Sequence, residues 1–160
     1  MTDRIEKTIL LKAPRARVWR AITDPAEFGH WFGIQFDGPF TPGRTCHGTV
    51  VGTKANAEVA EKQKNHEDLK CTMIIDRVEP ERFFSLRWHP NATDPKVDYS
   101  KEPTTLVAFV LDEVPEGIQL TLTESGFDGI PLERRAQAFA SNSGGWNIIL
   151  PVLGEYVARS

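Results

Sequence analysis

The residues that could bind a metal or attack a substrate are few and widely spaced. No two histidines stand as H-x-H or H-x-x-x-H beside a carboxylate, so the sequence indicates no local metal site formed by His30, His47, His66 and His89. His47 and His89 could converge from neighbouring strands, although surface or hydrogen-bonded histidines are the favoured interpretation. We therefore expect no bound metal.

Motifs for nucleophilic or nucleotide chemistry are missing from the sequence. Ser125 in "ESGF" lacks the G-x-S-x-G turn of hydrolases, and neither G-x-G-x-x-G nor G-x-x-x-x-G-K-[ST] occurs. Cys46 and Cys71 could meet across strands, but buried structural thiols are the favoured interpretation. Because two cysteines build no disulfide framework, we expect a reducing, cytoplasmic location. No cofactor is predicted.

The elements that must position any site begin with a strand and two short helices. Residues 4–11 alternate between apolar and polar side chains, which predicts a strand. Residues 13–23 predict a helix, because their apolar side chains lie one turn apart. Asp24 can cap a second helix, which ends at Gly29 or Gly33.

Residues 42–126 predict an antiparallel meander of strands joined by turns. Apolar side chains alternate along its segments, as at Phe84, Leu86 and Trp88. Residues 54–68 are either a long hairpin connection or a short helix, and residues 89–103 form a long loop with several prolines.

The C-terminal segment predicts one long helix. A stripe with spacings of three and four residues runs through Leu132, Ala136, Phe139, Ser143, Trp146, Leu150, Leu153 and Val157. Pro151 removes a backbone hydrogen bond and should bend the helix, while Gly144 and Gly145 leave one turn without side chains. Such a helix can wrap a curved sheet closely or leave a space against it.

This order of elements resembles the helix-grip fold of the START-like (SRPBCC) superfamily. The resemblance is closest to the branch similar to the activator of the heat-shock-protein-90 ATPase, in "APRARVWRAITDPAEFGHWF" (13–32), "FTPG" (40–43), "VEPERFFSLRW" (78–88), "LTLTESGF" (120–127) and "GGW" (144–146). It implies an α+β fold, with a curved antiparallel sheet of about six strands around the terminal helix and two short helices after the first strand. It also implies that residues 1–160 form a single domain corresponding to the C-terminal domain of the eukaryotic activator, with a role in stress response.

The resemblance further implies an apolar cavity between the sheet and the terminal helix. Its apolar candidates, each of which could instead be core, are Trp31, Phe32, Trp88, Phe109, Phe139, Trp146 and Leu150. The polar candidates for its mouth are His47, His89 and Glu124. Glu124 could be a polar anchor or base there, or a rim carboxylate that caps a loop or pairs with Arg77 or Arg87.

The favoured function is non-catalytic binding of a small hydrophobic or amphipathic ligand in this cavity. A protein-interaction module, such as a chaperone cofactor, and a cyclase- or hydrolase-like enzyme are the alternatives, so catalytic activity stays an open question. The net charge of −3 disfavours nucleic acid as a partner. No apolar run reaches the roughly 18 residues of a membrane helix, so we expect no membrane insertion. We expect a monomer or a homodimer.

Overall fold

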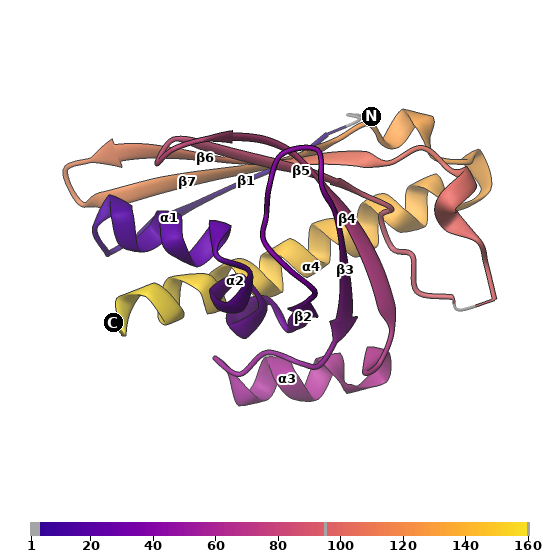
Figure 1. The fold of residues 1–160 in the computed structure, drawn as a ribbon, viewed down its shortest axis with the longest axis horizontal. Coiled ribbons are helices and arrows are strands. Elements are labelled where there is room, and N and C mark those ends of the chain that lie inside the picture. The colour runs from indigo at the N-terminus through magenta and orange to yellow at the C-terminus, as the bar shows by residue number, and fades with distance from the viewer. Residues whose placement is uncertain (1–3, 95, 160) are drawn as a thin grey trace.

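Seven antiparallel strands form one curved sheet in the spatial order β1-β7-β6-β5-β4-β3-β2 (Figure 1). The computed structural model describes residues 4–94 and 96–159. The strands are β1 (Arg4–Leu11), β2 (Ile34–Phe36), β3 (Thr45–Val50), β4 (Lys70–Glu79), β5 (Phe83–Trp88), β6 (Thr105–Val114) and β7 (Gly117–Ser125). The helix-grip prediction is confirmed, but the predicted strand count is one too low, because the three residues of β2 are too short to show an alternating pattern.

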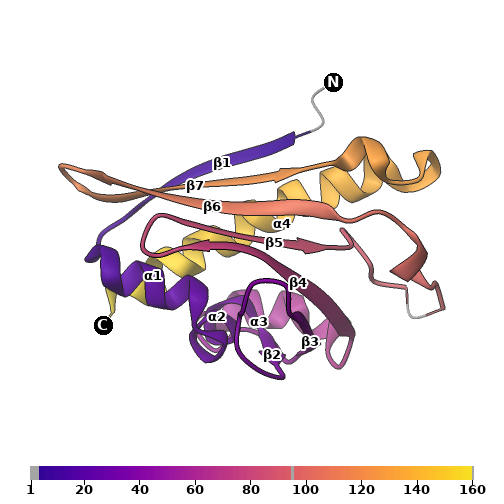
Figure 2. The same cartoon turned by 45° about the horizontal axis from the view of Figure 1, so that its top comes forward.

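The inner face of the sheet supplies much of the core. Phe84 and Leu86 of β5 are fully buried, as are Leu120 and Leu122 of β7. Phe109 of β6 pairs directly with Leu122 and is fully buried as well. The alternation predicted for these strands therefore sets which side chains face the helices, and α1, α2 and α4 lie on that one side of the sheet (Figures 1 and 2).

Two short helices, α1 (Arg15–Thr23) and α2 (Pro25–Phe32), connect β1 to β2. The Asp24 carboxylate caps α2 by accepting a hydrogen bond from the backbone N–H of Ala26 at 2.9 Å. The helix ends at Gly33, whose φ of 97° lies in the left-handed region that glycine adopts without strain. Of the two predicted ends, Gly33 is therefore the correct one.

The ambiguous segment 54–68 contains α3 (Ala57–Gln63) and the 3₁₀ turn η1 (Lys64–His66), so the short-helix alternative is correct. The Gln63 side chain fastens this segment to the end of α2. Its Oε1 accepts from the backbone N–H of Thr53 at 2.6 Å, and its Nε2 donates to the carbonyl of Phe32 at 3.0 Å. α3 thus has a fixed place beside the β3 end of the sheet (Figure 1).

The loop 89–103 contains one 3₁₀ turn, η2 (Tyr99–Lys101), and is tied to the terminal helix by Arg134. The Arg134 guanidinium donates from Nε to Glu102 at 2.9 Å and from Nη1 to the carbonyl of Pro90 at 2.9 Å. It also lies over the ring of Tyr99, 4.9 Å from its centroid. One side chain therefore holds three points of the loop.

The long helix α4 (Leu132–Ala158) follows the 3₁₀ turn η3 (Phe127–Gly129) and crosses beneath the sheet (Figure 1). The C-terminal half of the predicted stripe is confirmed, with four buried members, Trp146, Leu150, Leu153 and Val157. The beginning of the stripe is wrong, because Ala136 is exposed and Leu132 is 76% exposed. The first turns of α4 contact the loop 89–103 through Arg134.

Candidate functional site

A cavity of about 860 Å³ lies between the end of the sheet, α3, the loop 89–103 and α4. Apolar side chains from these parts and from the end of α2 form its wall, chiefly Phe32, Ile34, Val59, Trp88, Trp146 and Ile149. Polar side chains also line it, among them Lys62, Gln63, His66, His89, Asp98 and Ser141. The volume falls within the range of about 300–1,000 Å³ that is usual for small-molecule sites.

Glu124 is fully buried behind the aromatic part of this wall. Its Oε1 accepts the Trp146 indole N–H and its Oε2 accepts the Trp88 indole N–H, each at 2.9 Å. The Thr105 hydroxyl donates to Oε2 at 2.6 Å, and the Asn142 amide lies 2.9 Å and 3.1 Å from the two oxygens. Four side chains therefore satisfy one buried carboxylate.

Strand alternation and helix spacing bring these groups together. Glu124 follows Leu120 and Leu122 on the inward-facing side of β7. Trp88 and Thr105 are direct cross-strand partners in β5 and β6. Asn142 and Trp146 lie one helical turn apart on α4, so both side chains lie on the same face of the helix.

The two tryptophans form a stacked pair in the cavity wall. The ring centroids of Trp88 and Trp146 are 5.7 Å apart and their planes differ by 21°. Phe32 completes the group, with its ring centroid 5.9 Å from each of them. Because Glu124 satisfies both indole N–H groups, the pair adds aromatic carbon surface to the wall without an unpaired donor.

Two groups that could have done chemistry in this cavity are not arranged for it. Glu124 has no solvent exposure and does not line the cavity, and its oxygens accept five hydrogen-bond contacts from four side chains. Cys71 lines the cavity, but burial raises the pKa of its thiol to about 11. The thiol is therefore protonated near neutral pH and is a poor nucleophile. The wall is suited to contact with an apolar molecule.

Gly144 and Gly145 both border the cavity. A Cβ added at either position would have no neighbouring heavy atom within 4 Å. The 100° step of a helix suggests that at most one of two consecutive residues faces inward, but here the cavity is wide enough to reach both. The bare turn therefore leaves space and does not serve close packing against a strand.

The site residues predicted from the sequence lie in different parts of the structure. Phe32, Trp88, Trp146 and His89 line the cavity. Trp31, Phe109 and Leu150 are buried in the core, and Phe139 packs on Phe127 with ring centroids 5.0 Å apart. Glu124 lies behind the wall and not at the mouth. Among the described residues no arginine pairs with it, since Arg77 pairs with Glu79 and Arg87 with Asp76.

The cavity residues on α3 and η1 were not among the candidates. Val59, Lys62, Gln63 and His66 all line the cavity. The spacing of Val59, Lys62 and Gln63 is the available signal, because it places these three on one face of α3. The Asn56 cap, which accepts from the backbone N–H of Val59 at 3.0 Å, marks where that helix begins.

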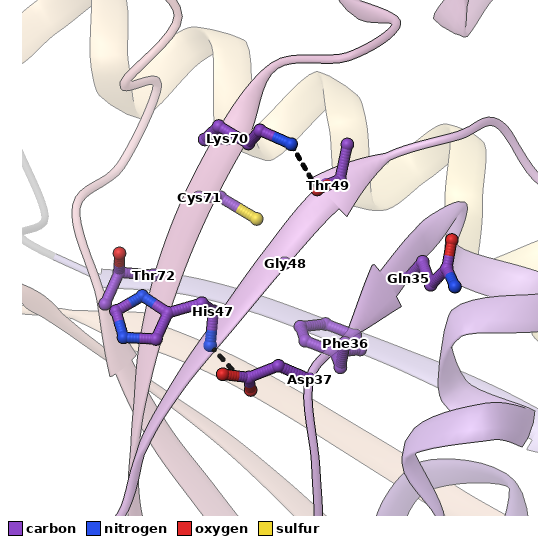
Figure 3. A pocket seen from close by; sticks show the side chains of 9 residues that line it. All are labelled: Gln35, Phe36, Asp37, His47, Gly48, Thr49, Lys70, Cys71 and Thr72. Carbon is purple, nitrogen blue, oxygen red and sulfur yellow. Dashed lines mark hydrogen bonds between the residues drawn. The ribbon is translucent and has the colours of Figure 1, made fainter.

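His47 lies at a second, smaller pocket of about 520 Å³ beside the edge strand β2 (Figure 3). Its backbone N–H donates to the Asp37 carboxylate at 3.0 Å, and the Lys70 ammonium donates to Thr49 at 3.0 Å (Figure 3). The charged groups here already have partners within the chain. His47 and His89 therefore line different pockets and form no shared site.

The described part of the chain also shows neither a metal-binding cluster nor a membrane-spanning helix. No cluster of three or more histidine, cysteine, aspartate or glutamate side chains in residues 4–94 and 96–159 could hold a metal ion. Over the same residues, no helix has the length and apolar character needed to cross a bilayer.

Comparison with known proteins identifies one family. The sequence model described as "Activator of Hsp90 ATPase homolog 1-like protein" matches residues 12–158. No curated protein matches the chain by sequence.

Several solved structures share the fold at low sequence identity. Protein MLL2253 from Mesorhizobium loti is 19% identical with a TM-score of 0.70, and the match covers 98% of both chains. Protein NE0264 from Nitrosomonas europaea is 16% identical with a TM-score of 0.69, over 98% of this chain and 94% of the other. DynU16, from the dynemicin biosynthetic locus, is 23% identical with a TM-score of 0.68, over 99% of this chain and 48% of the other. At these identities the likeness establishes the fold alone.

Proposed function

The chain belongs to the family of proteins similar to the activator of the Hsp90 ATPase, and from that premise we propose that it binds a small hydrophobic or amphipathic molecule in the cavity between the sheet and α4. The observation that carries this proposal is the aromatic wall. Trp88 and Trp146 are held by a fully buried carboxylate beside a cavity of about 860 Å³. A wall fixed before the ligand arrives lowers the ordering cost of binding.

Fluorescence titration with N-phenyl-1-naphthylamine, a neutral apolar probe, tests the proposal. We expect saturable one-to-one binding to the folded protein with a micromolar dissociation constant. Quenching or a spectral shift of tryptophan emission should accompany it. Binding that appears only in urea concentrations that loosen the fold would contradict the proposal, because exposed core also binds such probes.

A matched pair of variants ties the binding to this cavity. Ala140 lines the cavity and Ala136 is exposed without lining it, and both lie on α4. Ala140→Phe should weaken probe binding at least about tenfold by filling space, a loss of about 1.4 kcal/mol. Ala136→Phe makes the same chemical change on the same helix and should leave binding unchanged. Equal effects would mean that the probe binds elsewhere.

The alternative of a protein-interaction module, such as a chaperone cofactor, has less support from the surface. Among the described residues, the exposed large apolar side chains come from several elements, as with Leu10 on β1, Ile74 on β4 and Leu132 on α4. A docking site is usually marked by a contiguous apolar patch. A role in stress response and a cytoplasmic location stay predictions, which co-purification and localisation in the native host would test.

A further inference from the structure

Among the side chains lining the cavity, two on the α3 segment have no partner that would keep them from a ligand. Lys62, near the end of α3, and His66, in the 3₁₀ turn η1, both line the cavity and are both exposed. Among the described residues, neither side chain has a hydrogen bond or an ion pair to another group. An ammonium and an imidazole therefore both lie at the exposed rim of an apolar space.

Among the described residues, no acidic side chain forms an ion pair with Lys62 or His66. Among the described residues that line the cavity, Asp98 is the only acidic one, and it comes from the loop 89–103. Its carboxylate accepts from the hydroxyl of Ser100 at 2.5 Å and from the backbone N–H of the same residue at 3.1 Å. Glu61, next to Lys62 in the chain, is paired with Lys64 at 2.8 Å.

The backbone that carries Lys62 and His66 is fixed. Gln63 lies between them and bridges Thr53 and Phe32 with hydrogen bonds of 2.6 Å and 3.0 Å. Phe32 itself contacts the tryptophan pair, with ring centroids 5.9 Å from both. The polar rim and the apolar wall are therefore held in one arrangement by a short chain of contacts.

We propose that Lys62 and His66 form an anion subsite, so that the ligand of this cavity is an amphipathic acid with its apolar body on the aromatic wall and its acid group at α3. The inference rests on the proposed function and narrows its ligand class. An anion at this rim meets the Lys62 ammonium and the His66 imidazole, whereas a cation would meet the Lys62 ammonium.

Displacement of bound N-phenyl-1-naphthylamine by decanoate, 1-decanol and decyltrimethylammonium tests the inference, because the three share an apolar chain and differ in charge. We expect decanoate to bind about three- to fivefold more tightly than 1-decanol, which is the scale of a rim ion pair. Added salt should reduce that advantage. Decyltrimethylammonium should bind most weakly.

Variants of two neighbouring lysines provide the control. Lys62→Gln should lower decanoate affinity about three- to fivefold and leave 1-decanol unchanged, and the double change with His66→Gln should remove the preference. Lys64→Gln removes a lysine that is paired with Glu61 and does not line the cavity, so it should change neither affinity.

The outcomes separate the two proposals. Equal binding of decanoate and 1-decanol, or equal effects of Lys62→Gln and Lys64→Gln, would overturn the anion subsite while the proposed function stands. If neither the probe nor any of the three amphiphiles binds the folded protein, the proposed function fails and the subsite fails with it.

Discussion

Replacing Glu124 with glutamine tests whether the buried carboxylate holds the cavity wall. Each of its two oxygens accepts one indole N–H at 2.9 Å, from Trp146 at Oε1 and from Trp88 at Oε2. A carboxamide has the same shape but only one oxygen. Whichever way it is oriented, one indole N–H faces an NH₂ group and loses its acceptor. The Asn142 amide can flip and the Thr105 hydroxyl can rotate, but an indole N–H cannot become an acceptor.

The expected cost follows from that single orphaned donor. A buried unsatisfied N–H costs about 1–3 kcal/mol. The remaining bonds also weaken when the acceptor becomes neutral, while removing a buried charge returns part of its desolvation cost. We expect Glu124→Gln to lower the free energy of unfolding by about 2 kcal/mol.

Urea unfolding followed by far-ultraviolet circular dichroism measures this change without relying on tryptophan emission. Glu116→Gln is the control, because Glu116 is exposed in the turn between β6 and β7, and its effect should stay within about 0.5 kcal/mol. If Glu124→Gln is as stable as the wild type or more stable, burying the charge costs more than its hydrogen bonds return. The account of the wall as a structure fixed by Glu124 would then be refuted.

Two other predictions concern α4 and its contact with α2. Gly144→Ala and Gly145→Ala should each stabilise the protein by up to about 1 kcal/mol, because an added Cβ meets nothing within 4 Å. Probe binding should weaken, because each methyl group takes cavity space. Thermal melts and probe titrations of both variants check this, and a loss of stability in either variant would contradict the open turn. Burial raises the pKa of Glu27, but hydrogen bonds from Tyr156, Arg20 and Arg17 outweigh it and hold the pKa below the ordinary value of 4.5. The stabilising contribution of the Glu27 carboxylate is therefore present above pH 4.5 and is lost as the pH falls through the lowered pKa. Glu27→Gln should make the free energy of unfolding fall less steeply with decreasing pH. An unchanged pH dependence would contradict a stabilising role of the Glu27 carboxylate.

The sequence predicts the framework of this fold well because its signals are local. Alternation along β5 and β7 correctly places Phe84, Leu86, Leu120 and Leu122 in the core. The cap at Asp24 is equally local, since it depends on residues adjacent in the chain. Where a pattern has no tertiary partner to face, prediction fails, as at Leu132, which continues the stripe of α4 but remains exposed.

The candidate site is harder to predict because it depends on contacts between distant elements. Nothing in the sequence near Glu124 shows that Trp88 and Trp146, 36 and 22 residues away, donate to it. The same holds for Lys62 and His66, whose position depends on Gln63 reaching Phe32 across 31 residues. Residue type alone also does not separate core aromatics such as Trp31 from those that line the cavity.

Indole signals in ¹H–¹⁵N correlation spectra test the central claim most directly, because the chain has four tryptophans and each reports a different place. Trp88 and Trp146 line the cavity, whereas the N–H of Trp31 donates to the carbonyl of Ala21 at 2.8 Å in the core and Trp19 packs at the core's edge. On saturation with N-phenyl-1-naphthylamine, the signals of Trp88 and Trp146 should shift, and those of Trp31 and Trp19 should not. Unchanged Trp88 and Trp146 signals at saturation, or equal shifts of all four, would contradict binding in this cavity.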